Sequence, residues 1–241
     1  MRIGNLKPSE ELSYWVGVMQ SDGYFEKYTD CYKKTRYNAR VVVSPESSSM
    51  LIKFKRISKK IFKRDSKIFR MRTTNKISFK IGIGQFLKEL AVLDIKFGDP
   101  PKPPKWTLEC PNLFGAYLAG IVDVDGNIRM TFNKTKNYFQ CFIRIFSAHP
   151  QDELAQAIEQ NLNCKVYQDF DEETNIIEGR KVRGKTYYLQ FCVSTKNWKF
   201  FNKFVKSHLT LEHKCNTLNK YLKIVEASGR PRIPLLSQST P

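Results

Sequence analysis

The chain has 241 residues and carries 41 lysines and arginines against 23 aspartates and glutamates, a formal net charge of +18. A hydrophobic fraction of 41% and an aromatic fraction of 13% exclude a disordered chain or a simple basic arm. The length suits one large domain, or two of roughly 100 to 120 residues each. A folded body of this charge is typical of proteins that bind nucleic acid, although a ribosome-associated or merely soluble basic protein is the alternative.

The sequence also predicts a soluble, intracellular protein. Its six cysteines show no CxxC or CxxH spacing, which indicates reduced, mostly buried thiols and neither a disulfide framework nor a zinc site. The first seven residues lack the apolar core of a signal peptide, and no apolar run approaches the roughly 18 residues that a membrane span needs.

In chain order, Ser9 is a candidate N-cap for a first helix that ends at Asp22-Gly23, where glycine is expected to permit a left-handed turn. The pattern then predicts a strand pair, a helix, a second strand pair and a closing helix, at 24–28, 37–43, 50–62, 68–72, 76–83 and 85–93. Four prolines within 99–104 predict a short, stiff spacer.

The second half repeats this order. Its first helix is capped by Asn112 or starts beside Pro111, and it ends at Asp125-Gly126. The later elements are expected at 128–133, 139–146, 152–162, 165–170, 186–193 and 197–206.

An internal repeat supports this division. Residues 14–23 match residues 117–126 at an offset of 103, which a polar insertion at 169–184 later raises to 118. The expected fold is α+β, with two pseudo-symmetric αββαββα repeats at 1–98 and 109–227, a proline-rich linker at 99–108 and a flexible tail at 228–241. Ungapped pairing places Arg40 opposite Ile143, so the second hairpin is expected to be shifted by one residue.

The strands carry positive charge with a period of two. Arg70 and Arg72 are expected to share one face, and Lys76, Ser78 and Lys80 to share a face opposite the apolar residues. Such a basic sheet fits a DNA major groove, and a solvated sheet face is the alternative. The candidate DNA-binding residues are Lys27, Lys33, Lys34, Arg36, Arg40, Lys67, Arg70, Arg72, Lys76 and Lys80, followed by Arg129, Lys134, Lys136, Arg144, Arg180, Arg183 and Lys185.

Gly17 and Gly120 lie inside the two repeated helices, where each glycine costs about 1 kcal/mol relative to alanine. Close packing of these helices through the two glycines would place Asp22 and Asp125 side by side. Adjacent carboxylates at helix C-termini favour a bound divalent cation such as Mg²⁺, and hence metal-assisted phosphodiester hydrolysis. The simpler alternative is that each Asp-Gly is only a helix stop.

Residues 118–126 (LAGIVDVDG) resemble the signature of the LAGLIDADG homing endonucleases, and residues 15–23 (WVGVMQSDG) resemble a diverged first copy. The resemblance implies a monomeric, two-repeat enzyme with saddle-shaped antiparallel sheets and a central two-helix interface. Such an enzyme takes part in intron homing, cuts both strands of a long asymmetric DNA site across the minor groove, and leaves short 3′ overhangs. The expected cofactor is Mg²⁺ or Mn²⁺, and Ca²⁺ is expected to support binding without cleavage.

The resemblance also implies roles for particular residues. Asp22 and Asp125 would bind metal, with the carbonyls of Ser21 and Val124 as auxiliary ligands. Lys96 and Lys214 would act on water or the scissile phosphate. Asp123, matched by Gln20 in the first copy, would form hydrogen bonds at the helix junction instead of binding metal. At the strand-to-helix junctions, where many relatives carry glutamine or lysine, this chain has Ser44 and Ser147.

Two other functions remain open for this fold, an RNA maturase that assists intron splicing and a catalytically inactive, sequence-specific DNA-binding protein. Retention of both motif acids favours cleavage. The expected partner is a double-stranded DNA target, with RNA as a further partner of a maturase and with no obligate protein partner and no membrane. The expected compartment is a prokaryotic cytoplasm or an organelle matrix.

Overall fold

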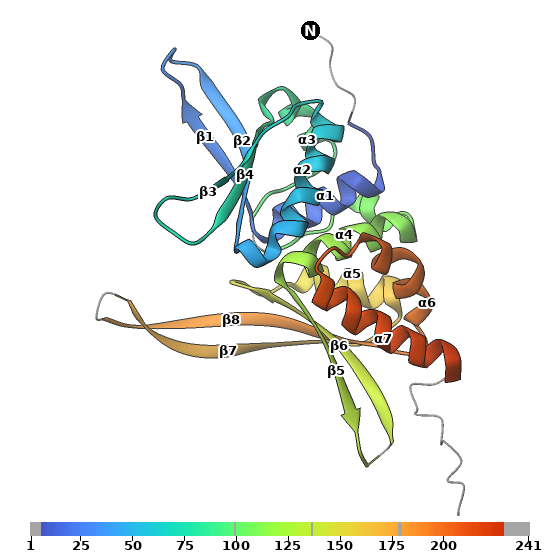
Figure 1. Cartoon of the computed structure of the whole chain (residues 1–241). Coiled ribbons are helices and arrows are strands. Elements are labelled where there is room, and N and C mark those ends of the chain that lie inside the picture. The colour runs from blue at the N-terminus through green and yellow to red at the C-terminus, as the bar shows by residue number, and fades with distance from the viewer. Residues whose placement is uncertain (1–5, 99, 136, 178–179, 229–241) are drawn as a thin grey trace, which may run out of the picture.

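The computed structural model describes residues 6–98, 100–135, 137–177 and 180–228. The two halves of the chain have the same architecture, each with one four-stranded antiparallel sheet and its own helices. Figure 1 shows the strands of both halves spreading to one side of a central pair of helices. The expected α+β fold with two pseudo-symmetric repeats is confirmed. Nearly all of the expected tail at 228–241 lies outside the described residues.

The N-terminal half follows the expected order of elements. These are α1 (Glu10–Ser21), β1 (Gly23–Thr29), β2 (Thr35–Val43), α2 (Ser48–Phe62), β3 (Ile68–Arg70), β4 (Ile77–Gly82) and α3 (Leu87–Val92). The sheet order is β1-β2-β4-β3. Its core forms around Trp15 of α1, which is fully buried and stacks on Phe54 of α2 with ring centroids 5.9 Å apart.

The C-terminal half repeats the same topology. Its elements are α4 (Pro111–Asp125), β5 (Gly126–Asn133), β6 (Tyr138–Ser147), α5 (Asp152–Leu162), β7 (Val166–Ile177), β8 (Arg180–Val193), α6 (Trp198–Phe200) and α7 (Glu212–Ser228). The sheet order is β5-β6-β8-β7, which matches that of the first half strand for strand.

Two features distinguish the C-terminal half. The polar insertion lengthens β7 and β8 into a hairpin that projects far from the body (Figure 1). The closing helical segment expected to begin at 197–206 is present but irregular, because the chain there forms α6, a π-helical turn (Phe201–Val205) and a 3₁₀ turn (Lys206–His208) before α7 begins.

The strand register confirms the one-residue shift expected in the second hairpin. Gly23 pairs with Val41, whereas the equivalent Gly126 pairs with Ile145. The offset between the repeats therefore rises from 103 at β1 to 104 at β2. Arg144, and not Ile143, is consequently the structural equivalent of Arg40.

The register overturns one expectation about the basic strands. Arg70 pairs with Ile77, whose side chain has the same parity as the buried Phe79. Arg70 is therefore on the helix-facing side of the sheet, and Arg72 lies beyond the end of β3, so the strand face that Arg70 and Arg72 were expected to share is not formed. The alternation of β3 cannot be extended through the irregular segment that follows it.

Helices α1 and α4 pack face to face through their glycines. A Cβ atom on Gly17 would lie 2.3 Å from the carbonyl oxygen of Tyr117, and one on Gly120 would lie 2.4 Å from that of Tyr14. Any side chain at these positions would separate the two backbones. The local packing therefore accounts for both helix-interior glycines.

The helix ends differ in part from expectation. Ser9 caps α1, since its Oγ accepts from the Leu12 N–H at 3.2 Å, but the N-cap of α4 is Cys110, with Pro111 as the first helical residue. The left-handed turn expected at the two Asp-Gly sequences is wrong, because Gly126 is extended with a φ of −83° and Gly23 does not have a positive φ. Close approach explains both glycines, since a Cβ would meet the preceding helical turn at 2.5 Å.

Other expectations concern the thiols and the membrane. All six cysteines are free, but the expectation that most of them are buried is wrong, because Cys141 alone is buried. Among the described residues, no helix combines the length and apolar character needed to cross a membrane.

Candidate active site and DNA-facing sheets

The two motif acids lie at equivalent ends of the packed helices. Asp22 is the C-cap of α1, and Asp125 is the last residue of α4. Because α1 and α4 are in contact along their length through Gly17 and Gly120, both acids reach the same end of the interface, where β1 and β5 begin. The carboxylate of Asp22 is accessible to solvent, but the surrounding protein removes enough water to raise its pKa.

Two lysines supply positive charge beside these acids. The charges of Lys76 and Lys214 both act to lower the pKa of Asp22, against the effect of desolvation. Lys214 of α7 is 6% exposed, and its Nζ donates to the carbonyl oxygens of Val122 and Asp123 at 2.8 and 2.9 Å. Burial lowers the pKa of Lys214, and nearby acids, including Asp22 and Asp125, oppose that shift. Lys214 therefore holds the last turn of α4 and adds charge to the acid pair.

Lys96 occupies a different environment from Lys214, although the repeat offset pairs them. Its side chain is 69% exposed, and its Nζ lies 3.5 Å from the carboxylate of Asp94. It follows α3 in an irregular segment, whereas Lys214 belongs to a helix. The lysine of the first half whose charge acts on Asp22 is Lys76, in the segment just before β4, which the sequence placed among the DNA-binding residues.

The carboxylate of Asp123 accepts hydrogen bonds from three protein groups. Its Oδ2 accepts from the Tyr14 hydroxyl at 2.7 Å, and its Oδ1 accepts from the N–H groups of Thr210 and Leu211 at 3.0 and 3.3 Å. Burial raises the pKa of Tyr14 well above its ordinary value, so the phenol stays protonated and donates. Asp123 thus ties α1, α4 and the start of α7 together.

The equivalent residue in the first half, Gln20, also forms hydrogen bonds across the helix junction, but it donates to backbone carbonyl groups where Asp123 accepts from backbone N–H groups. Its Nε2 donates to the carbonyl oxygens of Lys96 and Lys102 at 2.8 and 2.9 Å, and its Oε1 accepts from the Tyr117 hydroxyl at 2.7 Å. A carboxylate cannot donate, so an amide is needed where carbonyl groups face the side chain. The difference between glutamine and aspartate therefore follows from the backbone groups that each one meets.

The tyrosines Tyr14 and Tyr117 are functional residues that the sequence analysis missed. Each crosses the helix interface to the polar residue of the other repeat. A usable signal was present, because both lie at the repeat offset inside an apolar helix, where a buried hydroxyl requires a partner.

The acids fit a divalent cation by their chemistry. One carboxylate lies at the end of α1 and one at the end of α4, and oxygen ligands of this kind suit Mg²⁺. The Oγ of Ser21, next to Asp22, is buried without a hydrogen-bond partner among the described residues. No group of three or more histidine, cysteine or acidic side chains poised for a metal occurs in the described part of the chain.

The candidate DNA-binding residues divide between the two faces of each sheet. By register, the face away from the helices carries Arg36, Arg40 and Lys80 in the first half and Arg129 and Arg144 in the second. The other face of each sheet, on the side of the helices, carries Lys27, Arg70 and Lys185 near the sheet edges.

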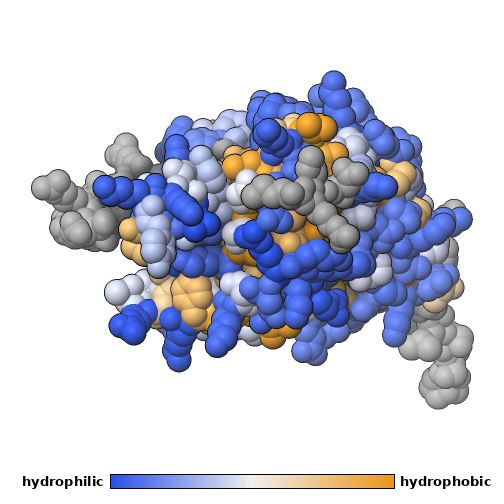
Figure 2. Space-filling view, turned by 90° about the horizontal axis from the view of Figure 1, so that it is seen from above, coloured by the Kyte–Doolittle hydropathy of each residue, from blue (hydrophilic) through white to orange (hydrophobic). Residues whose placement is uncertain are grey.

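The remaining candidates lie between strands or outside the described part. Turns and connecting segments carry Lys33, Lys34, Lys67, Arg72, Lys76 and Lys134. Lys136, and the side chains of Arg180 and Arg183, lie outside the part of the chain that the structure describes. Hydrophilic residues dominate the face of the molecule seen in Figure 2.

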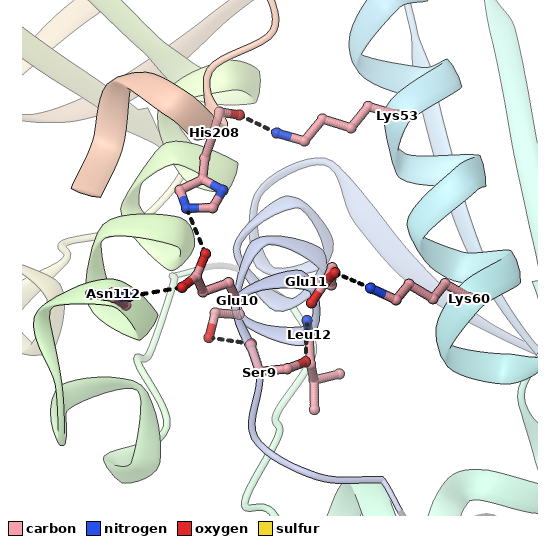
Figure 3. Close-up of polar contacts among 9 residues, drawn as sticks. Ser9, Glu10, Glu11, Leu12, Lys53, Lys60, Asn112 and His208 are labelled. Atoms are coloured by element: carbon pink, nitrogen blue, oxygen red, sulfur yellow. Dashed lines mark hydrogen bonds and ion pairs between the residues drawn. The ribbon is translucent and has the colours of Figure 1, made fainter. Parts of the chain in front are cut away.

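A second polar cluster lies at the other end of α1, away from the acids. Figure 3 shows Glu10 between Asn112 and His208, with Lys53 on the far side of His208. Asn112 Nδ2 donates to Glu10 at 2.9 Å, and His208 Nε2 lies 3.3 Å from the Glu10 carboxylate. Lys53 donates to the carbonyl of His208, with its Nζ 3.6 Å from the ring centroid of Tyr14. These contacts join the two halves.

Lys53 predicts a pH-dependent contribution to stability. Burial lowers its pKa to about 8, so in the folded protein it loses its proton well below the ordinary lysine value of 10.5. The unfolded chain therefore binds more protons between about pH 8 and 10.5, and stability from this group rises with pH across that window. We expect Lys53→Met to raise the free energy of unfolding by about 1–2 kcal/mol at pH 7, because removing the buried charge outweighs the lost hydrogen bond.

Urea denaturation of both proteins between pH 7 and 10.5 measures this effect. The advantage of the variant is expected to shrink as pH rises through 8, since the wild-type amine then becomes neutral. A difference between the proteins that does not change with pH would contradict the buried-charge explanation. Lys59→Met is the matched control, because Lys59 is 61% exposed on the same helix.

Comparison with known proteins identifies the fold. No protein-family model matches the sequence, and no curated protein matches it. Among solved structures, the fold is that of the LAGLIDADG homing endonucleases of the two-repeat, single-chain type. The sequence identities are low, so the likeness is one of fold.

Two of these structures show the extent of the match. A structure of the homing endonuclease I-DmoI in complex with DNA and Ca aligns with a TM-score of 0.55 at 14% identity, covering 89% of this chain and 100% of that one. The LAGLIDADG homing endonuclease I-LtrWI bound to target DNA aligns with a TM-score of 0.52 at 14% identity, covering 91% of this chain and 92% of that one. I-DmoI has also been solved in complex with DNA and Mn.

Proposed function

We propose that this protein is a site-specific, divalent-metal-dependent DNA endonuclease of the homing type. The observation that carries the proposal is the convergence of Asp22 and Asp125 at one end of the α1–α4 interface, at the starts of two basic sheets. The expected substrate is a long, asymmetric duplex, cut on both strands across the minor groove to leave short 3′ overhangs. The fold shared with DNA-bound homing endonucleases supports this assignment.

The chain's own residues would divide the work in the following way. The sheets grip the duplex, with arginine and lysine side chains reaching phosphates and base edges. Lys76 and Lys214 lie where their charge can stabilise a scissile phosphate as negative charge develops on it. The Tyr14–Asp123 and Tyr117–Gln20 hydrogen bonds keep the two helix ends, and hence the two acids, in fixed relation.

Asp22 and Asp125 would hold the metal, with the carbonyls of Ser21 and Val124 as candidate auxiliary ligands. When bound, Mg²⁺ or Mn²⁺ would supply Lewis-acid activation and charge neutralisation for phosphodiester hydrolysis. The protein's contribution is to bring the two carboxylates together and to surround them with the ammonium groups of Lys76 and Lys214.

Selection from a randomised duplex library tests this function. The protein is incubated with the library in Mg²⁺ to recover cleaved duplexes, and in Ca²⁺ to recover bound ones. We expect one enriched sequence class in both experiments, with double-strand cuts in Mg²⁺ alone. Tight retention of RNA without any cutting of DNA would favour a maturase, and binding of a DNA sequence without cutting would favour an inactive DNA-binding protein.

DNA affinity should also fall steeply with salt. If about six to ten phosphates are neutralised by the sheets, the association constant drops about 10³-fold or more between roughly 50 and 200 mM monovalent salt. Titration of the selected duplex at several salt concentrations, in Ca²⁺, measures this slope. A flat dependence would contradict binding through the basic sheets.

A further inference from the structure

The two sheets place one arginine each at equivalent positions. Arg40 of β2 pairs with Tyr24 of β1, and Arg144 of β6 pairs with Asn127 of β5. Tyr24 lies two residues after Asp22, and Asn127 lies two residues after Asp125. The two guanidinium groups are therefore related by the same pseudo-symmetry as the two acids.

Both side chains are held in place by the protein. Arg40 Nε donates to Ser78 Oγ at 3.0 Å, and its guanidinium lies 5.7 Å from the ring centroid of Tyr24 and 5.5 Å from that of Phe69. The carboxylate of Glu26 lies 3.5 Å from its Nη1. The Arg40 side chain is only 17% exposed, so its conformation is restricted before any ligand binds.

Arg144 has the same arrangement made from different residues. Its Nε donates to Gln190 Oε1 at 2.6 Å, and its guanidinium lies 4.8 Å from the ring centroid of Tyr188. It borders a hollow of about 300 Å³ on the face away from the helices, which Asn127, Arg129 and Gln190 also line. In both halves the protein binds Nε and an aromatic ring supports the guanidinium.

A guanidinium held through Nε keeps a fixed plane for its terminal amino groups, and the Glu26 carboxylate, 3.5 Å from Nη1, further restrains that plane in Arg40. That fork matches the O6 and N7 acceptors of guanine in the major groove, the commonest specific contact of arginine with DNA. Because these contacts already restrain the side chain, less conformational entropy is lost when DNA binds. Phosphate binding requires no such fixed plane and is also available to the exposed lysines.

We propose that Arg40 and Arg144 each read a guanine, and that the two guanines lie on opposite strands at equal distances from the centre of the cleavage site. This inference rests on the DNA-binding function proposed above. A duplex has its own local two-fold axes, so pseudo-symmetric side chains meet mirrored base pairs. The target, although asymmetric overall, therefore contains a palindromic pair of guanines.

The test compares duplexes bound from a randomised library in Ca²⁺ by the wild type, Arg40→Gln and Arg144→Gln. The wild type is expected to enrich guanine at two mirrored positions. Each variant should lose the preference at one position by about 5- to 140-fold, and adenine should gain there, because glutamine pairs with adenine N6 and N7. The guanine read by the unchanged arginine serves as the internal control for folding.

Arg36→Gln is the matched control. Arg36 lies on the same face of the same strand and is also held through Nε, but it is bound there by the Asp30 carboxylate at 2.8 Å, which neutralises its charge, and its side chain is 52% exposed. This variant should lower affinity and keep both guanines. The inference is overturned if both variants keep both guanines, or if the two affected positions lie at unequal distances from the centre. A wild type that retains no duplex overturns the proposed function and this inference together.

Discussion

Replacing Asp125 with asparagine is expected to abolish double-strand cleavage while DNA binding is retained. The substitution keeps the size of the side chain and removes the charge that a metal ligand needs, a loss of several kcal/mol of transition-state stabilisation or about 10²-fold or more in rate. Asp22→Asn should have the same effect, and either variant should at most nick one strand. Gel analysis of plasmid carrying the selected site distinguishes intact, nicked and linear products in Mg²⁺.

Asp65→Asn provides the control for this pair of variants. Asp65 is 53% exposed and pairs with Lys55 and Lys59 of α2, on the helical side of the first sheet. We expect it to leave linear product formation unchanged. Wild-type rates of linearisation by Asp22→Asn or Asp125→Asn would contradict the assignment of these residues as metal ligands.

Gly120→Ala is expected to be strongly destabilising. Its Cβ would lie 2.4 Å from the carbonyl oxygen of Tyr14, and helix backbones cannot yield as a flexible side chain does. Although alanine improves helix propensity by about 1 kcal/mol, we expect a net loss of about 3 kcal/mol or more. Denaturant unfolding monitored by circular dichroism measures this loss, and Gly17→Ala should behave alike.

Gly184→Ala is the matched control, because a Cβ at Gly184 would meet nothing within 4 Å. It should change the free energy of unfolding by less than about 1 kcal/mol. A stable Gly120→Ala protein that still cleaves DNA would show that the interface tolerates wider helix spacing than the structure requires.

Local patterning allowed the elements and their order to be predicted from the sequence. Apolar periodicity, the Ser9 cap and the repeated Asp-Gly sequences place α1, α4 and most strands within a few residues of their observed ends. The repeated motif, an apolar helix with an interior glycine followed by Asp-Gly, also predicted the packing of Gly17 against Gly120, because a helix keeps an interior glycine where a second backbone comes close. These features depend on residues close together in the chain.

The environment of the candidate site depended on contacts that no spacing rule supplies. Lys96 and Lys214 look equivalent in sequence, yet Lys214 is buried beside the acids in α7 and Lys96 is exposed beside Asp94. The charge that acts on Asp22 from the first half comes from Lys76, whose side chain the sequence assigned to DNA. After α3 the first half continues as an irregular segment that carries Lys96, whereas the corresponding part of the second half forms α7, which carries Lys214. A constant sequence offset cannot detect this difference in backbone structure.

The net charge of +18, the repeat and the motif acids were determined by the sequence itself, because each is a property of residue identity and local order. The tertiary structure decided which cations surround the acids, which arginines are held for base contact, and why glutamine replaces aspartate at position 20. Those outcomes depend on which backbone and side-chain groups meet across the α1–α4 interface and across the strands. Such contacts join residues 38 to 109 positions apart, and packing alone brings them together.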